Sequence, residues 1–240
     1  MPLPTGEASS VDDASSAVDT DTPDPTVRER HPSRQIAVIL FAATAVLVVG
    51  LFAASRDTAA EPWAGTVLPA PQEKPDITLT DTSGEPFDLR AETDGRATIM
   101  MFGYTSCPDI CPINLGTLDA AMEDLGPSTR DAIDVVFVTV DPDTDTPQVL
   151  REYLDRFDSR FVGLTGSPEQ LRAAQLAADV PPATRGSGSS TGSSGEIGHA
   201  TQMIFYDAAG VARIVYPFGA RQADWTRDLP RLLAGEIPTP

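Results

Sequence analysis

The placement of two cysteines constrains the fold of this chain more than any other feature. Cys107 and Cys111 are the only cysteines among 240 residues, and a mostly apolar run, 97–102, leads up to them. Apolar positions with helical spacing follow over 113–125. The segment therefore predicts a buried strand, a tight turn and a helix that begins near the cysteines.

The spacing of Cys107 and Cys111 suits more than one kind of chemistry. Residues four apart lie on one face of a helix, with Cα atoms about 6 Å apart, close enough for a disulfide or for one shared metal ion. A helix N-terminus also stabilises the thiolate form. A purely structural disulfide is the alternative, but a bridge across so short a loop constrains the unfolded chain little. The pattern favours a redox pair or part of a metal site.

Net charge excludes one class of partner. The formal net charge is −18, and Lys74 is the only lysine. Because no basic patch is present, we do not expect nucleic-acid binding. The acidic residues are spread along the chain, which indicates a solvated surface; an acidic docking face for a basic partner is the alternative.

The N-terminal part of the sequence predicts a membrane anchor. Residues 1–34 are polar and are expected to be a disordered cytoplasmic tail. Residues 35–55 carry no charge and are long enough to span a bilayer as a transmembrane helix. Arginines precede this span, which predicts a cytoplasmic N-terminus and an extracytoplasmic C-terminal domain at the cell membrane. A cleaved signal peptide is the alternative. Residues 56–75 contain several prolines and predict an extended tether.

Residues 76–240 show the pattern of one α/β domain. Strands are expected at 77–80, 86–89, 96–104, 133–140, 161–164, 201–206 and 211–216, and helices at 113–125, 146–157, 167–178 and 223–233. This order predicts a mixed sheet with helices on both faces, in a thioredoxin-like arrangement. The Gly- and Ser-rich stretch 186–198 is expected to be a mobile loop.

His199 is the only histidine of the expected domain, since the other, His31, lies in the tail. In a thioredoxin-like fold, the turn before the strand 201–206 faces the cysteine turn and usually carries a proline, which is missing here. Two thiolates and one imidazole suit Cu(I) and could also hold Cu(II). The local pattern leaves a second interpretation open, in which His199 is a polar residue at a strand start.

Three blocks of sequence resemble the Sco/SenC family of membrane-anchored copper-binding proteins. They are Phe102–Pro112, Val138–Pro147 with the FVGLTG segment 161–166, and His199 with the segment 206–210. The likeness covers about residues 70–235. The cysteine block is specific, and the Asp-Pro-x-x-Asp-Thr-Pro pattern in the second block strengthens the resemblance.

The resemblance implies a function for these residues. Cys107, Cys111 and His199 would bind copper, and the two cysteines would cycle between dithiol and disulfide. Family members help to build the dinuclear copper site of cytochrome c oxidase subunit II, by delivering copper, by reducing that site's cysteines, or both. One alternative is an extracytoplasmic thiol–disulfide oxidoreductase without an obligatory copper role, and a weaker one is a peroxidase-type redoxin.

Two acidic residues after the strand 133–140 are further candidates. Asp141 and Asp145 are expected at the sheet edge that carries the cysteine turn. They either form the turn and cap the next helix, or support the metal ligands or a docking partner. The neighbouring methionines Met100 and Met101 are expected to be strand residues, one facing each helix layer.

Overall fold

The computed structural model describes residues 32–54, 62–185 and 197–238. Most of the predicted tail 1–34 and of the predicted loop 186–198 lies outside the described residues. The chain folds as two compact units, Met1–Ala60 and Glu61–Pro240.

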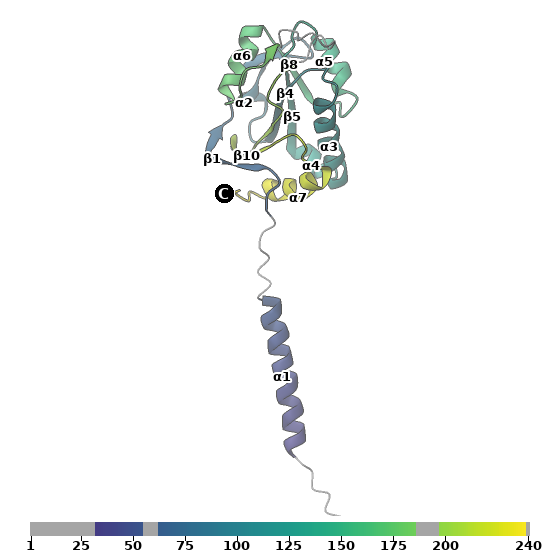
Figure 1. Ribbon diagram of the computed structural model, residues 1–240, viewed down its shortest axis with the longest axis vertical. Helices are drawn as coiled ribbons and strands as arrows, with labels where there is room; N and C mark the ends of the chain where they lie inside the picture. Colours follow the sequence, from purple (N-terminus) through teal and green to yellow (C-terminus); the bar gives the residue numbers. More distant parts are fainter. Residues whose placement is uncertain (1–31, 55–61, 186–196, 239–240) are drawn as a thin grey trace, which may run out of the picture. The chain divides into compact units, whose positions relative to one another are not determined.

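The first unit contains one helix, α1 (Pro32–Ala54), where the sequence predicts one over 35–55 (Figure 1). Side chains of this helix are described for residues 36–47. Within the described residues, no helix combines the length and the apolar character needed to cross a membrane.

The second unit is built on one eight-stranded mixed sheet. Its strands, in spatial order, are β1 (Thr66–Glu73), β10 (Val211–Tyr216), β9 (Met203–Tyr206), β4 (Ala97–Gly103), β5 (Ile133–Thr139), β6 (Val162–Thr165), β2 (Thr78–Asp81) and β3 (Pro86–Asp88). The three neighbours β4, β5 and β6 run parallel, and the other pairs run antiparallel. Two short strands, β7 (Thr184–Arg185) and β8 (Ile197–Gly198), form a separate ribbon.

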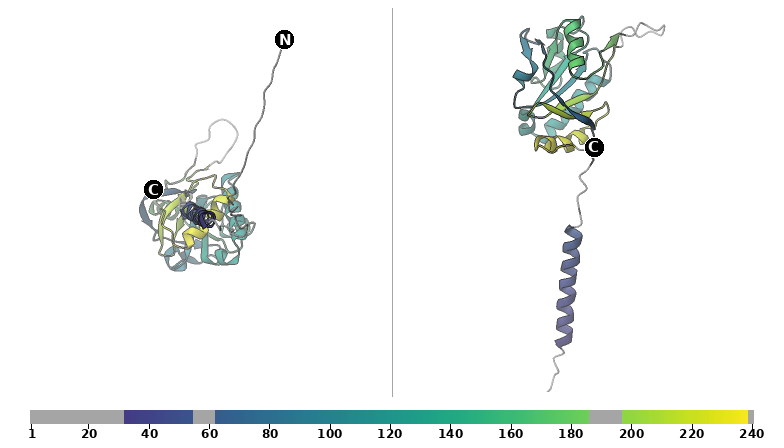
Figure 2. Two further views of the ribbon diagram at one scale, coloured as in Figure 1. Left: turned by 90° about the horizontal axis from the view of Figure 1, so that it is seen from below. Right: turned by 90° about the vertical axis from the view of Figure 1, so that its left-hand side faces the viewer.

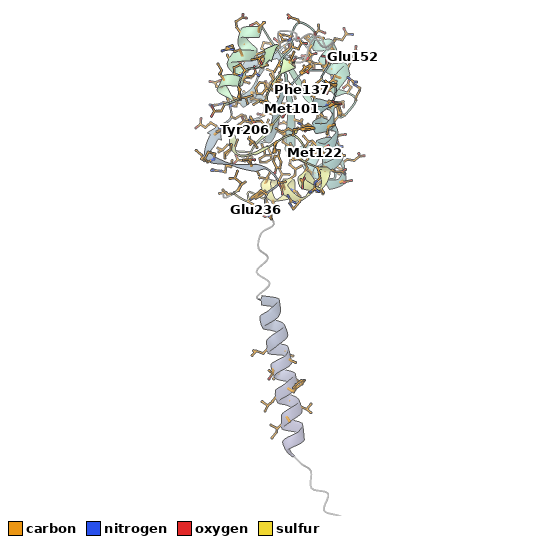
Figure 3. All side chains as sticks on the ribbon, viewed as in Figure 1. Met101, Met122, Phe137, Glu152, Tyr206 and Glu236 are labelled. Carbon is orange, nitrogen blue, oxygen red and sulfur yellow. The ribbon has the colours of Figure 1, made fainter. Side chains whose placement is uncertain are left out.

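Helices cover both faces of the sheet, as predicted (Figure 1). They are α2 (Leu89–Glu92), α3 (Ile110–Leu125), α4 (Pro127–Ala132), α5 (Pro147–Leu154), α6 (Pro168–Ala177) and α7 (Gln222–Leu233). Residues of α3, α5 and α7 share a buried cluster with one face of the sheet, and residues of α2 and α6 share a second cluster with the other face. Figure 3 labels Met101, Met122 and Phe137 of the first cluster and Tyr206 of the second.

The central strands are buried on both sides, so their side chains divide between the two clusters. Met101 packs in the cluster with α3, and its neighbour Met100 packs in the cluster with α6. This confirms the expectation that the two methionines face opposite layers, as the two-residue period of a strand requires.

The prediction of an extended tether over 56–75 is wrong for residues 66–73. Residues 66–73 form β1, which pairs antiparallel with β10 at the edge of the sheet (Figure 2, dark blue). Proline is tolerated on an edge strand because its missing N–H can face away from the ladder. The register shifts between Val67 and Gln72, and both Pro69 and Pro71 lie in that interval. The domain therefore begins before residue 76, the boundary expected from the sequence.

A buried carboxylate fastens the first residues of the domain to α7. Asp228 is fully buried and accepts hydrogen bonds from the Ala64 N–H (2.9 Å) and the Tyr216 hydroxyl (3.1 Å). The Arg227 Nε also donates to it at 2.9 Å. Next to this contact, the Arg231 guanidinium lies 3.7 Å from the centre of the Trp63 ring. Asp228 thus joins β10, α7 and the segment that leads into β1.

We expect Asp228→Ala to lower the free energy of unfolding by about 3 kcal/mol, because it leaves buried donors without an acceptor. Urea unfolding of the full chain measures the loss. Glu73→Ala is the control, since its ion pair with Arg90 is largely exposed and worth about 0.5 kcal/mol or less. Equal losses for the two variants would contradict the role of Asp228.

Candidate metal centre

The two cysteines lie at the junction between β4 and α3, but only one belongs to the helix. Cys111 is in the first turn of α3. Cys107 precedes the helix and lies in a turn that is closed by a hydrogen bond from the Cys107 N–H to the Tyr104 carbonyl (3.2 Å). Pro108 disfavours helical backbone angles at the residue before it, which explains why Cys107 stays outside. The Cys111 N–H points at the Cys107 Sγ, 3.5 Å away. Both thiols are free and buried.

A glycine at the end of β4 allows the Cys111 sulfur to approach the sheet. A Cβ atom on Gly103 would lie 2.7 Å from the Cys111 Sγ and 2.8 Å from the Phe137 ring, closer than real Cβ contacts come. Any side chain at Gly103 would therefore displace either the sulfur or the aromatic ring. The position of the Cys111 sulfur depends on this missing side chain.

Asp145 joins the cysteine turn to the end of β5. Its fully buried carboxylate accepts hydrogen bonds from the Thr105 N–H (3.0 Å), the Thr105 hydroxyl (2.5 Å) and the Thr139 hydroxyl (2.6 Å). The cap of α5 is the neighbouring Thr146, whose hydroxyl accepts from the Val149 N–H. Asp145 therefore contacts the cysteine turn and does not cap the helix.

Asp141, the other acidic candidate, shapes the turn after β5. Its N–H donates to the Thr139 hydroxyl (2.9 Å), and its carbonyl accepts from the Asp145 N–H (2.8 Å). These backbone contacts agree with the turn role that the sequence suggested for Asp141. They also keep Asp145 in a position where its carboxylate accepts hydrogen bonds from the cysteine turn.

His199 reaches the cysteines from the segment between β8 and β9. Its Nδ1 lies 2.8 Å from the Ala200 carbonyl. A carbonyl oxygen only accepts hydrogen bonds, so this contact requires the proton on Nδ1 and leaves a lone pair on Nε2. The imidazole also packs edge-on against the Tyr104 ring, with the ring centres 5.4 Å apart. The contact orients the ring beside the cysteine turn.

One residue that positions His199, Asn114, was not predicted from the sequence. Asn114, buried on α3 one turn after Cys111, donates from Nδ2 to the Thr201 carbonyl at 3.0 Å. This bond fastens the histidine segment to the cysteine helix. The available signal was an amide side chain three residues after Cys111, beside the apolar positions of the helix.

Together these contacts bring one ligand atom each of Cys107, Cys111 and His199 within 4.8 Å of one another. Elsewhere in the described ranges, no other group of three such side chains comes as close. Burial is the main cause that raises the pKa of Cys111, so its thiol is protonated at neutral pH. A metal ion bound here would displace that proton. Two sulfurs and one imidazole form a soft donor set that suits copper.

Comparison with known proteins supports this description. The SCO1/SenC family model matches residues 66–234. A protein named as a putative copper-binding protein from Stutzerimonas stutzeri is 39% identical over 124 residues, which are 51% of this chain and 60% of that protein. An SCO2-like protein from Rickettsia felis is 43% identical over 97 residues, 40% of this chain and 46% of that one. The chain thus spans about half the length of these relatives.

Solved structures with the same fold extend the match to most of the second unit. Apo Sco1 from Thermus thermophilus has a TM-score of 0.59 at 29% identity, over 74% of this chain and 96% of that one. Copper-bound ScoI from Arabidopsis thaliana has a TM-score of 0.59 at 26% identity, over 67% and 98%. The family resemblance predicted from the three sequence blocks is confirmed. Since the family model matches well over half of its residues, the chain belongs to the SCO1/SenC family.

Proposed function

We propose that this chain binds copper through Cys107, Cys111 and His199 and assists the assembly of cytochrome c oxidase. The convergence of two sulfurs and one imidazole nitrogen within 4.8 Å carries the proposal. The solved ScoI structures from Arabidopsis thaliana and Bradyrhizobium japonicum hold copper, which supports it. The proposed recipient is the dinuclear copper site of oxidase subunit II.

The thiols and the imidazole have separate roles in the proposed metal binding. The two thiols supply sulfur ligands once their protons leave, and the Nδ1–H bond to Ala200 keeps the Nε2 lone pair available for a metal. Burial of both cysteines excludes water and so protects a soft, oxidisable ion. The bound copper ion would itself be the cargo that is transferred to the oxidase.

The same cysteines support a thiol-exchange step. Cys107 is 7% exposed and Cys111 is 0% exposed, so we assign the attack on a partner's disulfide to Cys107. The Cys107 thiolate forms a mixed disulfide and releases one partner thiolate. Cys111 then attacks the Cys107 sulfur, and its proton passes to the second partner thiolate as that thiolate leaves, so two electrons pass to the partner and an internal disulfide remains. Copper delivery and thiol reduction thus use one pair of sulfurs.

We further propose that the segment 35–55, of which the structure describes the side chains of residues 36–47, is the membrane anchor, with residues 57–240 on the extracytoplasmic side. The absence of charge from 35–55 and the arginines before it support this orientation.

The first test is a copper titration of the reduced full chain with Cu(I), in competition with a chromophoric chelator. We expect one equivalent to bind, and His199→Ala to weaken binding at least about 100-fold, or about 2.7 kcal/mol, through loss of one of three ligands. His31→Ala is the matched control and should bind as the parent does.

The same samples are then assayed for reduction of an oxidised peptide that carries the subunit II copper-site cysteines. If the peptide is reduced while the parent binds no copper, the copper proposal is wrong and the chain is a thiol–disulfide oxidoreductase. A Cys107→Ser variant should lose both properties, because it removes a ligand and the attacking sulfur together.

The second test concerns Asp145. We expect Asp145→Asn to weaken Cu(I) binding about 10- to 100-fold, because an amide cannot accept from all three threonine donors that hold the cysteine turn. Asp109→Asn is the control: it removes the same charge between the two cysteines, at an exposed residue without a side-chain capping bond. If the two variants lose affinity equally, charge and not the hydrogen bonds of Asp145 is responsible.

A further inference from the structure

His199 lies between a segment that is fastened to α3 and a short ribbon. On its C-terminal side, Asn114 of α3 donates to the Thr201 carbonyl. On its N-terminal side, the chain forms β8, which pairs with β7 in a ribbon of two residues per strand. So short a ribbon is not stable through its own ladder and needs contacts with the rest of the domain. The position of His199 therefore depends on what holds this ribbon.

The strand β8 is held by packing in the core. Ile197, two residues before His199, is 5% exposed and belongs to the buried cluster that contains both cysteines. It pairs with Arg185 of β7, and Gly198 pairs with Thr184. Packing beside β7 is less complete, because a pocket of about 230 Å³ is lined both by α6 and by the segment that leads into β7. The strand β7 therefore needs a contact of another kind.

That contact comes from Gln175, in the last turn of α6 (Figure 1 labels α6 and β8). Its side-chain oxygen accepts a hydrogen bond from the Ala183 N–H at 3.2 Å, one residue before β7 begins. Pro181 and Pro182 have no N–H, so Ala183 carries the only backbone donor between Val180 and β7. The bond to Gln175 uses that single donor.

The burial of Gln175 indicates that the bond is specific. The residue is 3% exposed, on a helix whose first turn is fixed by a capping box at Ser167. Its amide oxygen faces Ala183, and its amide nitrogen is buried with no partner among the residues that the structure describes. A buried donor without a partner is unfavourable and uncommon. An apolar side chain of similar size would avoid that cost but would lose the bond to Ala183.

We propose that Gln175 is a positioning residue that holds the β7–β8 ribbon on α6 and thereby keeps His199 beside the cysteines. The helix α6 packs in the cluster on one face of the sheet, whereas Ile197 of the ribbon packs in the cluster on the other face. His199 is thus restrained on both sides, by α3 through Thr201 and by α6 through the ribbon. The effect on copper rests on the proposed function, but the restraint on the ribbon does not.

Hydrogen exchange of the metal-free full chain, followed by mass spectrometry, tests the restraint. Gln175→Met keeps an unbranched side chain and removes the acceptor. We expect peptides that cover 181–185 and 197–201 to exchange about tenfold faster in this variant, with parental protection in β4 and β5. Gln170→Met is the matched control on the same helix, since that amide bonds Ser167 in the helix cap and not the ribbon. Unchanged exchange in the two ribbon peptides, or a loss that spreads to β4 and β5, overturns the inference.

A Cu(I) titration of four chains then separates the histidine from the rest of the site. The chains are the parent, Gln175→Met, His199→Ala and the double variant. We expect Gln175→Met to lower the affinity about three- to tenfold in the parent and to have no further effect in His199→Ala, because the restraint acts through the histidine. An equal loss in both backgrounds contradicts that role. A parent that takes no copper refutes the proposed function instead, and hydrogen exchange alone then decides the restraint.

Discussion

The buried carboxylate of Asp145 is the interaction on which the candidate site depends. It accepts from the turn that carries Cys107 and from the end of β5, so the cysteine turn cannot move away from the sheet while these bonds hold. Asn114 fastens the histidine segment to α3 by donating a hydrogen bond to the Thr201 carbonyl. Two polar side chains thus assemble three segments that lie far apart in the sequence. The ligand atoms themselves make few of the contacts that bring them together.

Burial disfavours free thiolates at this site, and a bound cation would offset that cost. Cys111 is buried so completely that its pKa rises and its thiolate is disfavoured. Gly103 also has no side chain, which allows the Cys111 sulfur to approach the sheet. Both features agree with a site shaped for a charged, sulfur-bound state.

Much of this architecture could be predicted because the apolar patterns are strong. The doubly buried β4, the hairpin β9–β10 and the Thr146 cap of α5 follow from alternation, turn residues and capping chemistry. β1 was missed because Pro69 and Pro71 suggest an extended tether, and only the partner strand β10 shows that the edge tolerates them. Asn114 was missed for another reason: its local sequence is ordinary for a helix. Its role comes from a contact across the fold, which no local pattern contains.

The hydrogen bond between Ala64 and Asp228 has a mechanical consequence. It holds the chain's entry into the domain on α7, at the end opposite β8 and α5 in Figure 1, and β1 continues from there along the sheet edge. A pull on the segment before Trp63 would be resisted by Asp228 and by the β1–β10 ladder, loaded in shear. The cysteine turn and the histidine segment are held by other bonds, those of Asp145 and Asn114, so such a pull does not act on them directly.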